Sequence, residues 1–546
     1  MTNFLYFHFM PTLPDAPFPH FDALLQDAAW PRVALVLRVF LLIGFVSLLF
    51  RMHLRARRER RGTPVRVWPR RLSLAVFLFL ALIAGRQAQW QLFGVRNEKF
   101  VAFMQRYDRR EFNPAHHVRP GQIQDRKGRV LAGSRVTEGG LRRVYPFGPI
   151  FSHVLGYNHP VYGLTGLEAA ARTVLMGGTL RGTEDLAALG ASLIDREGHA
   201  EGPPLVTTLD LDLQVKAYEL LEGRKGSVVW MDVRTGDVLV MVSRPDFDPN
   251  RLHPRLFAGQ VPDAPLLNRA LSGQYPPGSV YKVMIAAAGL REGFTGTLDT
   301  PASGFTTSPA NPPIRDHEYY VAQKDGRAWG GHGRLGMGAA LARSSNVFFA
   351  QLGVQVGWDA HARVADALGM NRAIPLWERR ELTLDVKPAK IPALSDRTPY
   401  GIAQYSIGQG ELLVSPMHMA MLAAAVARGG QVVYPRLDAR MPVREGGWIC
   451  GAAAAEQLKW MMHRVVTEGT GRGMAMAALP VAGKTGTAET GGNQPSHSWF
   501  MGFTPVSEPR WAFAVLVEHG GYGSRAALPV ARELLDEGVR QGWLVP

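Results

Sequence analysis

The chain of 546 residues has a single cysteine, Cys450. One thiol cannot form a disulfide within the chain, and Cys450 fits no metal-binding motif. We therefore expect it to be a small, semi-buried hydrophobic side chain. Disulfide-stabilised scaffolds and cysteine-ligated metal sites are excluded, and neither a metal ion nor another cofactor is predicted.

Acidic residues are outnumbered, because 46 Asp and Glu stand against 61 Lys and Arg, a formal net charge of +15. Such an excess can indicate nucleic-acid binding. Here, however, nine arginines and only one glutamate lie between residues 51 and 71, with an apolar run on each side. Membrane topology explains this arrangement better, so no nucleic-acid partner is predicted.

The two apolar runs predict two transmembrane helices, which makes the membrane an expected partner. Residues 33–50 are almost wholly apolar, interrupted by Arg38, and the second run begins at residue 72. Extending the second run to Trp68 and Trp90 gives about 33 Å of helix, enough to cross a hydrocarbon core of roughly 30 Å. The tryptophans then anchor the helix in the two interfaces. We assign the helices to residues 33–50 and 72–90.

Charge predicts the orientation of these helices. Loops rich in Lys and Arg stay in the cytoplasm, so residues 51–71 are expected to form a basic cytoplasmic loop. Residues 1–32 then form an extracytoplasmic tail, and the large C-terminal part also lies outside the cytoplasm. Two alternatives stay open for the first run. One is a signal-peptide core, although the run is long and lacks a small-residue cleavage site; the other is a helix lying in the interface with Arg38 toward the headgroups.

The most informative stretch runs from Tyr275 to Leu290. Its two prolines and first glycine cannot lie inside a helix, whereas the residues from Val280 to Leu290 predict a buried one. Ser279 falls at the helix start, and Lys282 lies three residues on, so its amine can reach the serine hydroxyl. A desolvated lysine can take the proton of a serine nucleophile. Standing alone, this spacing would more often be a helix cap beside a solvated charge.

Two further motifs follow in order along the chain. They are Ser344-Ser345-Asn346 and Lys484-Thr485-Gly486-Thr487. Ser-x-x-Lys, Ser-x-Asn and Lys-Thr-Gly in this order form the signature set of penicillin-binding proteins and serine β-lactamases. On these residues the chain resembles the class B penicillin-binding proteins, which are membrane-anchored peptidoglycan D,D-transpeptidases. Such enzymes usually have one N-terminal anchor, whereas this sequence predicts two spans.

Strand patterns at both ends of the C-terminal part, with helices between them, predict an antiparallel sheet flanked by helices and hence an α+β fold. This agrees with the penicillin-binding transpeptidase fold that the resemblance implies, with a cleft beside one edge strand. The expected strands are residues 227–233, 238–243, 498–503 and 511–517, and the expected helices include residues 211–221 and 529–539.

The resemblance covers the chain from Gln91 to the C-terminus and implies two parts. Residues 206–546 are expected to form the transpeptidase domain. Residues 91–205 are expected to form a small β-rich pedestal of the dimerisation type, in which residues 119–132 predict a strand, a turn and a strand. The turn glycines and aromatic residues of this part are explained by folding alone.

The resemblance also implies catalytic roles. Ser279 would be the nucleophile that forms an acyl-enzyme with a D-Ala-D-Ala stem peptide, and Lys282, deprotonated by burial near other cations, would take its proton. Ser344 would pass a proton toward the leaving amine. Asn346 would hydrogen-bond the substrate backbone and fix Lys282. The identity of the general base is disputed in this superfamily.

The third motif is expected to hold the substrate. Lys484 would supply positive charge near the substrate carboxylate, and the hydroxyls of Thr485 and Thr487 would bond to it. Gly486 would let the substrate approach the edge strand and pair with it as an added strand. The backbone N–H groups of Ser279 and Thr487 would form the oxyanion hole.

Two other features are interpreted as structural. The stretch from Gly401 to Gly410 contains the Ile-Gly-Gln-Gly segment of the family and is expected to support the cleft. His497 invites a catalytic role, but a hydrogen-bonded histidine in a strand is the simpler interpretation.

Three rival functions were weighed against the transpeptidase. A class A β-lactamase needs a Glu-x-x-x-Asn box after Asn346, and neither Glu378 nor Glu381 is followed by the asparagine. A β-lactam receptor needs a cytoplasmic signalling domain, for which the basic loop is too short. An idle scaffold does not need the intact Ser279 and Lys282. The expected partners are therefore stem peptides as donor and amine acceptor, β-lactam antibiotics and, as a candidate, a membrane glycan polymerase.

Overall fold

The computed structural model describes residues 78–79, 82–83, 119–137, 140–176, 202–379, 382–392, 397–476, 479–491 and 494–544. Its contacts divide the chain into two units, Met1–Gln105 and Arg106–Pro546. The predicted N-terminal tail, first transmembrane helix and basic loop lie outside the described residues. Of the predicted second span, Leu78, Phe79, Leu82 and Ile83 are described, and they are helical with exposed side chains. No described helix has the length and apolar character that a membrane span requires.

The first part of the second unit is built on a small sheet of four strands in the order β3-β2-β1-β6. The predicted strand, turn and strand are confirmed, because β1 and β2 pair antiparallel around a turn at residues 126–128. The strands are β1 (Ile123–Gln124), β2 (Val130–Thr137), β3 (Gly140–Val144) and β6 (Leu205–Val206). Short elements complete it: η2 (Gly148–Phe151), α5 (Ser152–Leu155), β4 (Asn158–His159), β5 (Gly163–Leu164), α6 (Gly166–Ala170) and α7 (Arg172–Leu175).

A five-stranded antiparallel sheet in the order β15-β16-β17-β7-β8 organises the rest of the chain. It confirms the predicted α+β fold, and the expected strands agree with the observed ones to within about a residue at each end. The strands are β7 (Gly226–Asp232), β8 (Val238–Arg244), β15 (Ala482–Ala488), β16 (His497–Thr504) and β17 (Trp511–Val517). The Lys-Thr-Gly motif lies on β15, which is an edge strand, as expected.

The side chains of the central strand, β17, point alternately to the two faces of the sheet and are apolar on both, which explains why helices cover both faces. Ala512, Ala514 and Leu516 of β17 join a core with α16 (Pro416–Ala427) on one face. Phe513 and its alternate neighbours join a second core with α9 (Leu211–Leu220) and α18 (Ala527–Arg540) on the other. Each large side chain buried in this way contributes about 1.5–3 kcal/mol.

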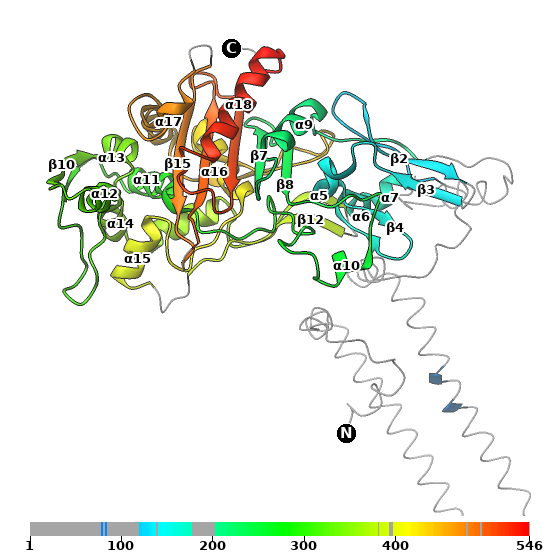
Figure 1. Ribbon diagram of the computed structural model, residues 1–546, viewed down its shortest axis with the longest axis horizontal. Coiled ribbons are helices and arrows are strands. Elements are labelled where there is room, and N and C mark those ends of the chain that lie inside the picture. Colours follow the sequence, from blue (N-terminus) through cyan, green and yellow to red (C-terminus); the bar gives the residue numbers. More distant parts are fainter. Residues whose placement is uncertain are drawn as a thin grey trace, which may run out of the picture. The chain divides into compact units, whose positions relative to one another are not determined.

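The remaining helices and hairpins are inserted between β8 and β15, and α12, α13 and α14 gather beyond the β15 edge (Figure 1). The helices are α10 (Pro254–Phe257), η3 (Gly278–Tyr281), α11 (Lys282–Arg291), α12 (His317–Lys324), α13 (Met337–Arg343), α14 (Asn346–Ala367, broken at Gly357), α15 (Pro399–Ser406), α17 (Ala452–Thr467) and η5 (Arg472–Met474). The hairpins pair β9 (Thr297–Pro301) with β10 (Gly331–Gly336), β11 (Ile374–Arg379) with β12 (Leu382–Val386), and β13 (Gln431–Val433) with β14 (Glu445–Trp448).

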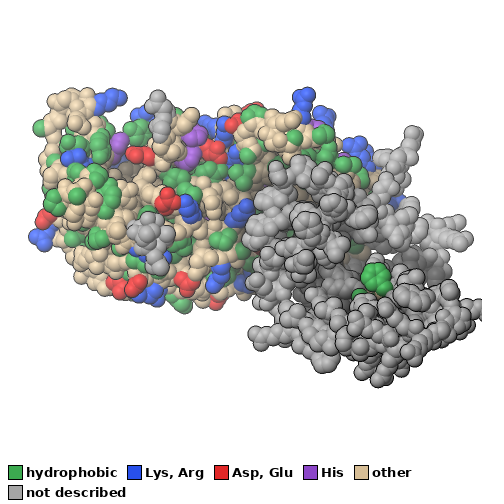
Figure 2. All heavy atoms as spheres, turned by 90° about the horizontal axis from the view of Figure 1, so that it is seen from below, with side chains coloured by type: hydrophobic (Ala, Val, Ile, Leu, Met, Phe, Trp, Pro, Cys, Tyr) green, Lys and Arg blue, Asp and Glu red, His purple; other side chains and the backbone are tan. Residues whose placement is uncertain are grey.

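Charges of both signs are mixed on one face of the described part (Figure 2), and the single cysteine is buried. On the face shown in Figure 2, the basic and acidic side chains of the described part are interspersed rather than gathered by sign. Cys450 is buried, and burial raises the pKa of its thiol to about 11, so it stays protonated at neutral pH. It therefore packs as a small apolar residue.

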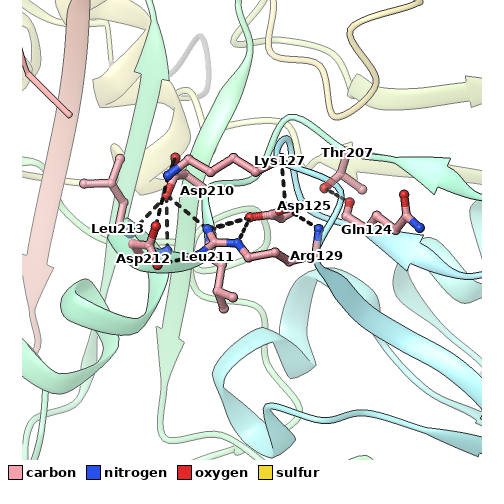
Figure 3. A network of polar contacts seen from close by, with 9 residues as sticks. All are labelled: Gln124, Asp125, Lys127, Arg129, Thr207, Asp210, Leu211, Asp212 and Leu213. Carbon is pink, nitrogen blue, oxygen red and sulfur yellow. Dashed lines mark hydrogen bonds and ion pairs between the residues drawn. The ribbon is translucent and has the colours of Figure 1, made fainter. Parts of the chain in front are cut away.

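A polar network fastens the turn between β1 and β2 to the start of α9 (Figure 3). The Arg129 guanidinium lies 2.7 Å from a carboxylate oxygen of the fully buried Asp125 and 2.6 Å from one of Asp212, and Lys127 lies 3.0 Å from Asp212. Asp210 caps α9 by accepting from the first backbone N–H groups of the helix. Hydrogen bonds from Arg129 and Lys127 lower the pKa of Asp212, which keeps the network charged.

Candidate active site

The predicted nucleophile lies in a tight turn, which we call the Ser279 turn (Tyr275–Lys282). The prediction of one continuous helix from Val280 is wrong in its first residues. Gly278–Tyr281 form a 3-10 turn, and the α-helix begins at Lys282. The prolines before Gly278 lack backbone donors, and Gly278 has φ +55°, so the chain enters the helix through a tighter turn. Ser279 stays partly exposed, whereas Lys282 is fully buried.

Backbone contacts from distant segments hold this turn in place. The Gly278 N–H donates to the Gly408 carbonyl at 2.9 Å, and the Trp499 indole donates to the Pro276 carbonyl at 3.0 Å. A Cβ atom on Gly408 would meet the Gly278 carbonyl oxygen at 2.0 Å, so only glycine fits there. The Ile-Gly-Gln-Gly segment therefore has the supporting position expected of it.

The start of the turn is hydrogen-bonded to Glu518, the residue after β17, which also forms a largely buried ion pair. The Tyr275 hydroxyl donates to Glu518 Oε1 at 2.6 Å, and the Arg269 guanidinium donates to the same oxygen at 2.7 Å. Arg269 is almost fully buried and also donates to the Asp263 carbonyl. Glu518 thus fixes both the turn and the segment that precedes it.

The amine of Lys282 is held by the second motif. Its Nζ donates to the Ser344 carbonyl at 2.6 Å and to Asn346 Oδ1 at 2.7 Å, and it lies 3.4 Å from Ser344 Oγ. Asn346 is itself oriented by donating its amide to the Arg315 carbonyl at 2.9 Å. In this geometry Asn346 and Ser344 fix the lysine, as the resemblance implied for Asn346.

Ser344 connects the two lysines. Its Oγ lies 2.8 Å from Lys484 Nζ, which also donates to the Thr485 carbonyl at 2.9 Å. Ser344 ends α13 in the left-handed conformation, with φ +61°. A residue other than glycine held there stores strain of order 1–3 kcal/mol, a feature that clusters at functional sites.

Burial changes the protonation of both lysines. Desolvation lowers the pKa of Lys282 to about 7, although the negative charges of Asp316 and Glu318 oppose the shift. Desolvation and the neighbouring charge of Lys282 lower the pKa of Lys484 well below its ordinary value. A proton on one lysine disfavours a proton on the other, so the buried pair favours a single positive charge.

The third motif lies on the edge strand, next to the Ser279 turn. The hydroxyls of Thr485 and Thr470 are hydrogen-bonded at 2.7 Å, and the Thr487 hydroxyl accepts from the Gly523 N–H at 3.3 Å. A Cβ atom on Gly486 would come within 3.0 Å of Val280 and of Trp499. The absence of a side chain at Gly486 is therefore already explained by its packing against the turn.

His497 is a structural residue, as expected. It begins β16, its Nδ1 accepts from the His519 N–H at 3.1 Å, and its ring packs edge-on against Tyr275. Burial lowers the pKa of His497 to about 4, so the ring is neutral at neutral pH. In the described ranges, no three His, Cys, Asp or Glu side chains come together in a metal-binding arrangement.

The structure therefore brings Lys282, Ser344, Asn346 and Lys484 into one hydrogen-bonded array beside the Ser279 turn. Sequence reasoning missed four residues that contact this array or its supports: Asp316, Thr470, Glu518 and Gly523. Only Gly523 carried a signal, because it belongs to a glycine-rich stretch after β17. Asp316, Thr470 and Glu518 belong to no motif that was recognised in the sequence.

Comparisons with known proteins agree with this geometry. The family model of the penicillin binding protein transpeptidase domain matches residues 226–536, and that of the penicillin binding protein A dimerisation domain matches residues 120–187. The chain is 30% identical to the peptidoglycan D,D-transpeptidase PbpA of Mycolicibacterium smegmatis, over 87% of this chain and 99% of that protein. It is 27% identical to the peptidoglycan D,D-transpeptidase MrdA of Escherichia coli, over 73% of this chain and 71% of that protein.

A solved structure shows the same fold. It is penicillin-binding protein A of M. tuberculosis as a ceftriaxone acyl-enzyme complex, with a TM-score of 0.67 and 28% identity. The match covers 78% of this chain and 99% of that one.

Proposed function

The chain belongs to the class B penicillin-binding proteins, and we propose that it is a peptidoglycan D,D-transpeptidase in which Ser279 forms the acyl-enzyme. The observation that carries the proposal is the array of two buried lysines joined through the Ser344 hydroxyl, next to the Ser279 turn. Nucleophile, base, proton carrier and cation then lie on elements fixed by packing. This is what acyl transfer through a serine requires.

Acylation begins when the Ser279 hydroxyl attacks the carbonyl carbon of the penultimate D-alanine. Neutral Lys282 takes the hydroxyl proton. Its own hydrogen atoms are directed to the Ser344 carbonyl and to Asn346, which leaves the nitrogen lone pair for the incoming proton. A pKa of about 7 makes roughly half of the lysine neutral at neutral pH, a good match to this task.

The tetrahedral intermediate then collapses and releases D-alanine. The peptide C–N bond breaks, and the Ser344 hydroxyl passes a proton from the lysine pair to the leaving amine. The contact of Ser344 Oγ with Lys484 supports this route, since both lysines reach the same oxygen. In the second half-reaction, an acceptor amine attacks the ester, a new amide forms and Ser279 regains its proton.

Charge on the substrate is neutralised at the edge strand. Lys484 and the hydroxyls of Thr485 and Thr487 bind the terminal carboxylate, and its negative charge favours the protonated form of Lys484. The N–H groups of Ser279 and Thr487 stabilise the oxyanion. Two observations support this pairing: a Cβ atom on Gly278 would lie 2.5 Å from the Thr487 carbonyl oxygen, and Gly486 packs against the turn.

We also propose that residues 33–50 and 72–90 anchor the enzyme in the inner membrane, with residues 91–205 as the pedestal and residues 206–546 as the periplasmic catalytic domain. The arginine cluster at residues 51–71 supports the orientation. A membrane glycan polymerase is the partner that would supply the strands to be cross-linked. Cysteines placed at Asp15 and Ala56, after Cys450 is replaced, should react with an impermeant thiol reagent in intact cells and only after lysis, respectively.

The catalytic proposal is tested with the full chain in detergent. A fluorescent penicillin should label the wild type at one equivalent and leave Ser279→Ala unlabelled, and mass spectrometry should place the adduct on Ser279. A chromogenic cephalosporin should give a single burst near one equivalent, because no residue in the proposed site activates water against the ester. An adduct on Ser344 would overturn the assignment, and sustained turnover would support a β-lactamase instead.

A further inference from the structure

A buried carboxylate lies directly behind the second motif. Asp316 is only 1% exposed, although it precedes α12 in a polar loop. Its oxygens accept from the Ser345 hydroxyl, both at 3.0 Å, and Oδ1 also accepts from the Val347 N–H at 3.0 Å. A carboxylate is costly to bury unless charge and hydrogen bonds compensate for lost water. Burying Asp316 therefore costs free energy, which its hydrogen bonds have to offset.

Asp316 and its neighbour Arg315 both hydrogen-bond to the segment that begins at Ser345. The Arg315 carbonyl accepts from the Asn346 amide at 2.9 Å, while Asp316 binds Ser345 and the next backbone N–H. Ser345 in turn caps α14 by accepting from the Phe348 N–H. A shift of Asp316 therefore moves the two residues that hold the Lys282 amine.

Several charged groups face this carboxylate and Lys282. Glu318 of α12 and His332 of β10 lie on the Asp316 side, with His332 Nε2 3.8 Å from Asp316 and 3.5 Å from Glu318. Arg343 of α13 lies 3.2 Å from the other nitrogen of His332. Lys484 of β15 faces Lys282 across the Ser344 hydroxyl. The two active-site lysines therefore have one fully buried anion on their side, Asp316, and one half-exposed anion, Glu318.

We propose that Asp316 is a positioning residue of the acylation machinery, which orders Ser344-Ser345-Asn346 and supplies the negative charge that balances the lysine pair. The inference rests on the proposed function. Asp316 touches neither substrate nor Ser279 in this proposal, and it acts through Ser345 and through its field at Lys282. Consistent with this, its charge raises the pKa of Lys282 against the opposing effect of burial.

The sign of the effect follows from the charge. Removing the negative charge of Asp316 makes protonation of Lys282 less favourable, so the neutral base persists to lower pH. The acid limb of the acylation rate should therefore move down. An opposite charge at short range typically shifts a pKa by about 1–3 units, so a change of about one pH unit is expected.

The experiment measures the rate of acylation by a fluorescent penicillin from pH 5 to 9, with the full chain in detergent. Asp316→Asn keeps the shape and can still accept from Val347, so its acid limb should lie about one unit below that of the wild type. Glu318→Gln is the matched charge control on a more exposed group, and its limb should move the same way by less. Ser345→Ala removes the hydrogen bond to Asp316 without changing any charge. The maximal acylation rate at high pH should therefore fall about tenfold or more, while the midpoint of the acid limb stays in place.

The possible results distinguish a failure of the proposed role of Asp316 from a failure of the proposed function. An acid limb of Asp316→Asn that overlays the wild type, with equal thermal stability, overturns the inference and leaves the function intact. If Asp316→Asn does not fold, an unchanged plateau of the acylation rate in Ser345→Ala overturns the positioning role, because Asp316 is proposed to act through Ser345. If Ser279→Ala labels as well as the wild type, the proposed function itself has failed.

Discussion

Replacing Gly278 with alanine tests whether the Ser279 turn and the edge strand β15 act as one unit. Gly278 has φ +55°, and a Cβ atom there would lie 2.5 Å from the Thr487 carbonyl oxygen and 2.9 Å from its carbon. These are backbone atoms of the strand that carries the third motif, so no side chain can move aside. Either the turn or the strand must shift by several tenths of an ångström.

The size of the effect follows from two contributions. The left-handed conformation costs an alanine roughly 1–2 kcal/mol, and forcing extra volume into packed backbone costs about 1–3 kcal/mol. Gly278→Ala should therefore destabilise the fold by about 2–5 kcal/mol. Separating the N–H groups of Ser279 and Thr487 removes a proposed oxyanion donor, which should slow acylation about 10²–10³-fold.

Gly293 provides a matched control at the other end of the same helix. It has φ +77°, and a Cβ atom there would have no neighbour within 4 Å. Gly293→Ala should therefore show only the conformational cost, roughly 1–2 kcal/mol, with acylation unchanged. Thermal unfolding and the time course of fluorescent penicillin labelling measure the two effects. A folded Gly278→Ala variant that acylates within a few-fold of Gly293→Ala would refute the coupling of turn and strand.

Three further predictions concern protonation and buried charge. The acylation rate of the wild type should rise with pH through a midpoint near 7, because the pKa of Lys282 is about 7 and the base must be neutral; a flat profile from pH 5 to 9 contradicts this role. Glu518→Gln leaves the Arg269 guanidinium buried without its counter-charge, so stability should fall by about 3–5 kcal/mol, measured by thermal unfolding, with slower labelling. Arg129→Met removes the half-exposed partner of Asp125, whose backbone hydrogen bonds remain, so a loss of only about 1–2 kcal/mol is expected; an unchanged midpoint would mean that the network adds no stability.

The sheet and the three motifs were predictable because their signals are local. Strands such as β17, with apolar residues on both faces, form continuous apolar runs that a single sequence displays. The prolines and glycine of the Ser279 turn likewise mark a helix boundary. What the sequence did not specify was the 3-10 geometry between Gly278 and Lys282, because the pattern that predicts an α-helix also suits a tighter first turn.

Asp316 and Glu518 show why the rest of the site was not predictable. Each stands in a stretch without a recognisable motif, and each acts on a residue far along the chain: Asp316 on Ser345 and Glu518 on Arg269, which precedes it by 249 positions. The contact of Glu518 with Arg269 forms only once β17 pairs with β7 and β16, and the contact of Asp316 with Ser345 forms only once the segment before α12 packs against the start of α14. Short spacings in sequence cannot encode them.

The two kinds of residue also differ in what chemistry demands of them. Ser279, Lys282 and Lys484 must be those residue types because the chemistry needs a hydroxyl, a deprotonatable amine and a cation at fixed places. Their motifs can therefore be recognised in the sequence. Asp316 has to provide only one negative charge and acceptors for a hydroxyl and a backbone N–H, and a carboxylate from another position in the fold can do the same. A supporting role defined by charge and direction, rather than by a reacting atom, can therefore be recognised only when the contacts of Asp316 with Ser345 and Val347 are known. The pH profile of Asp316→Asn measures that role directly.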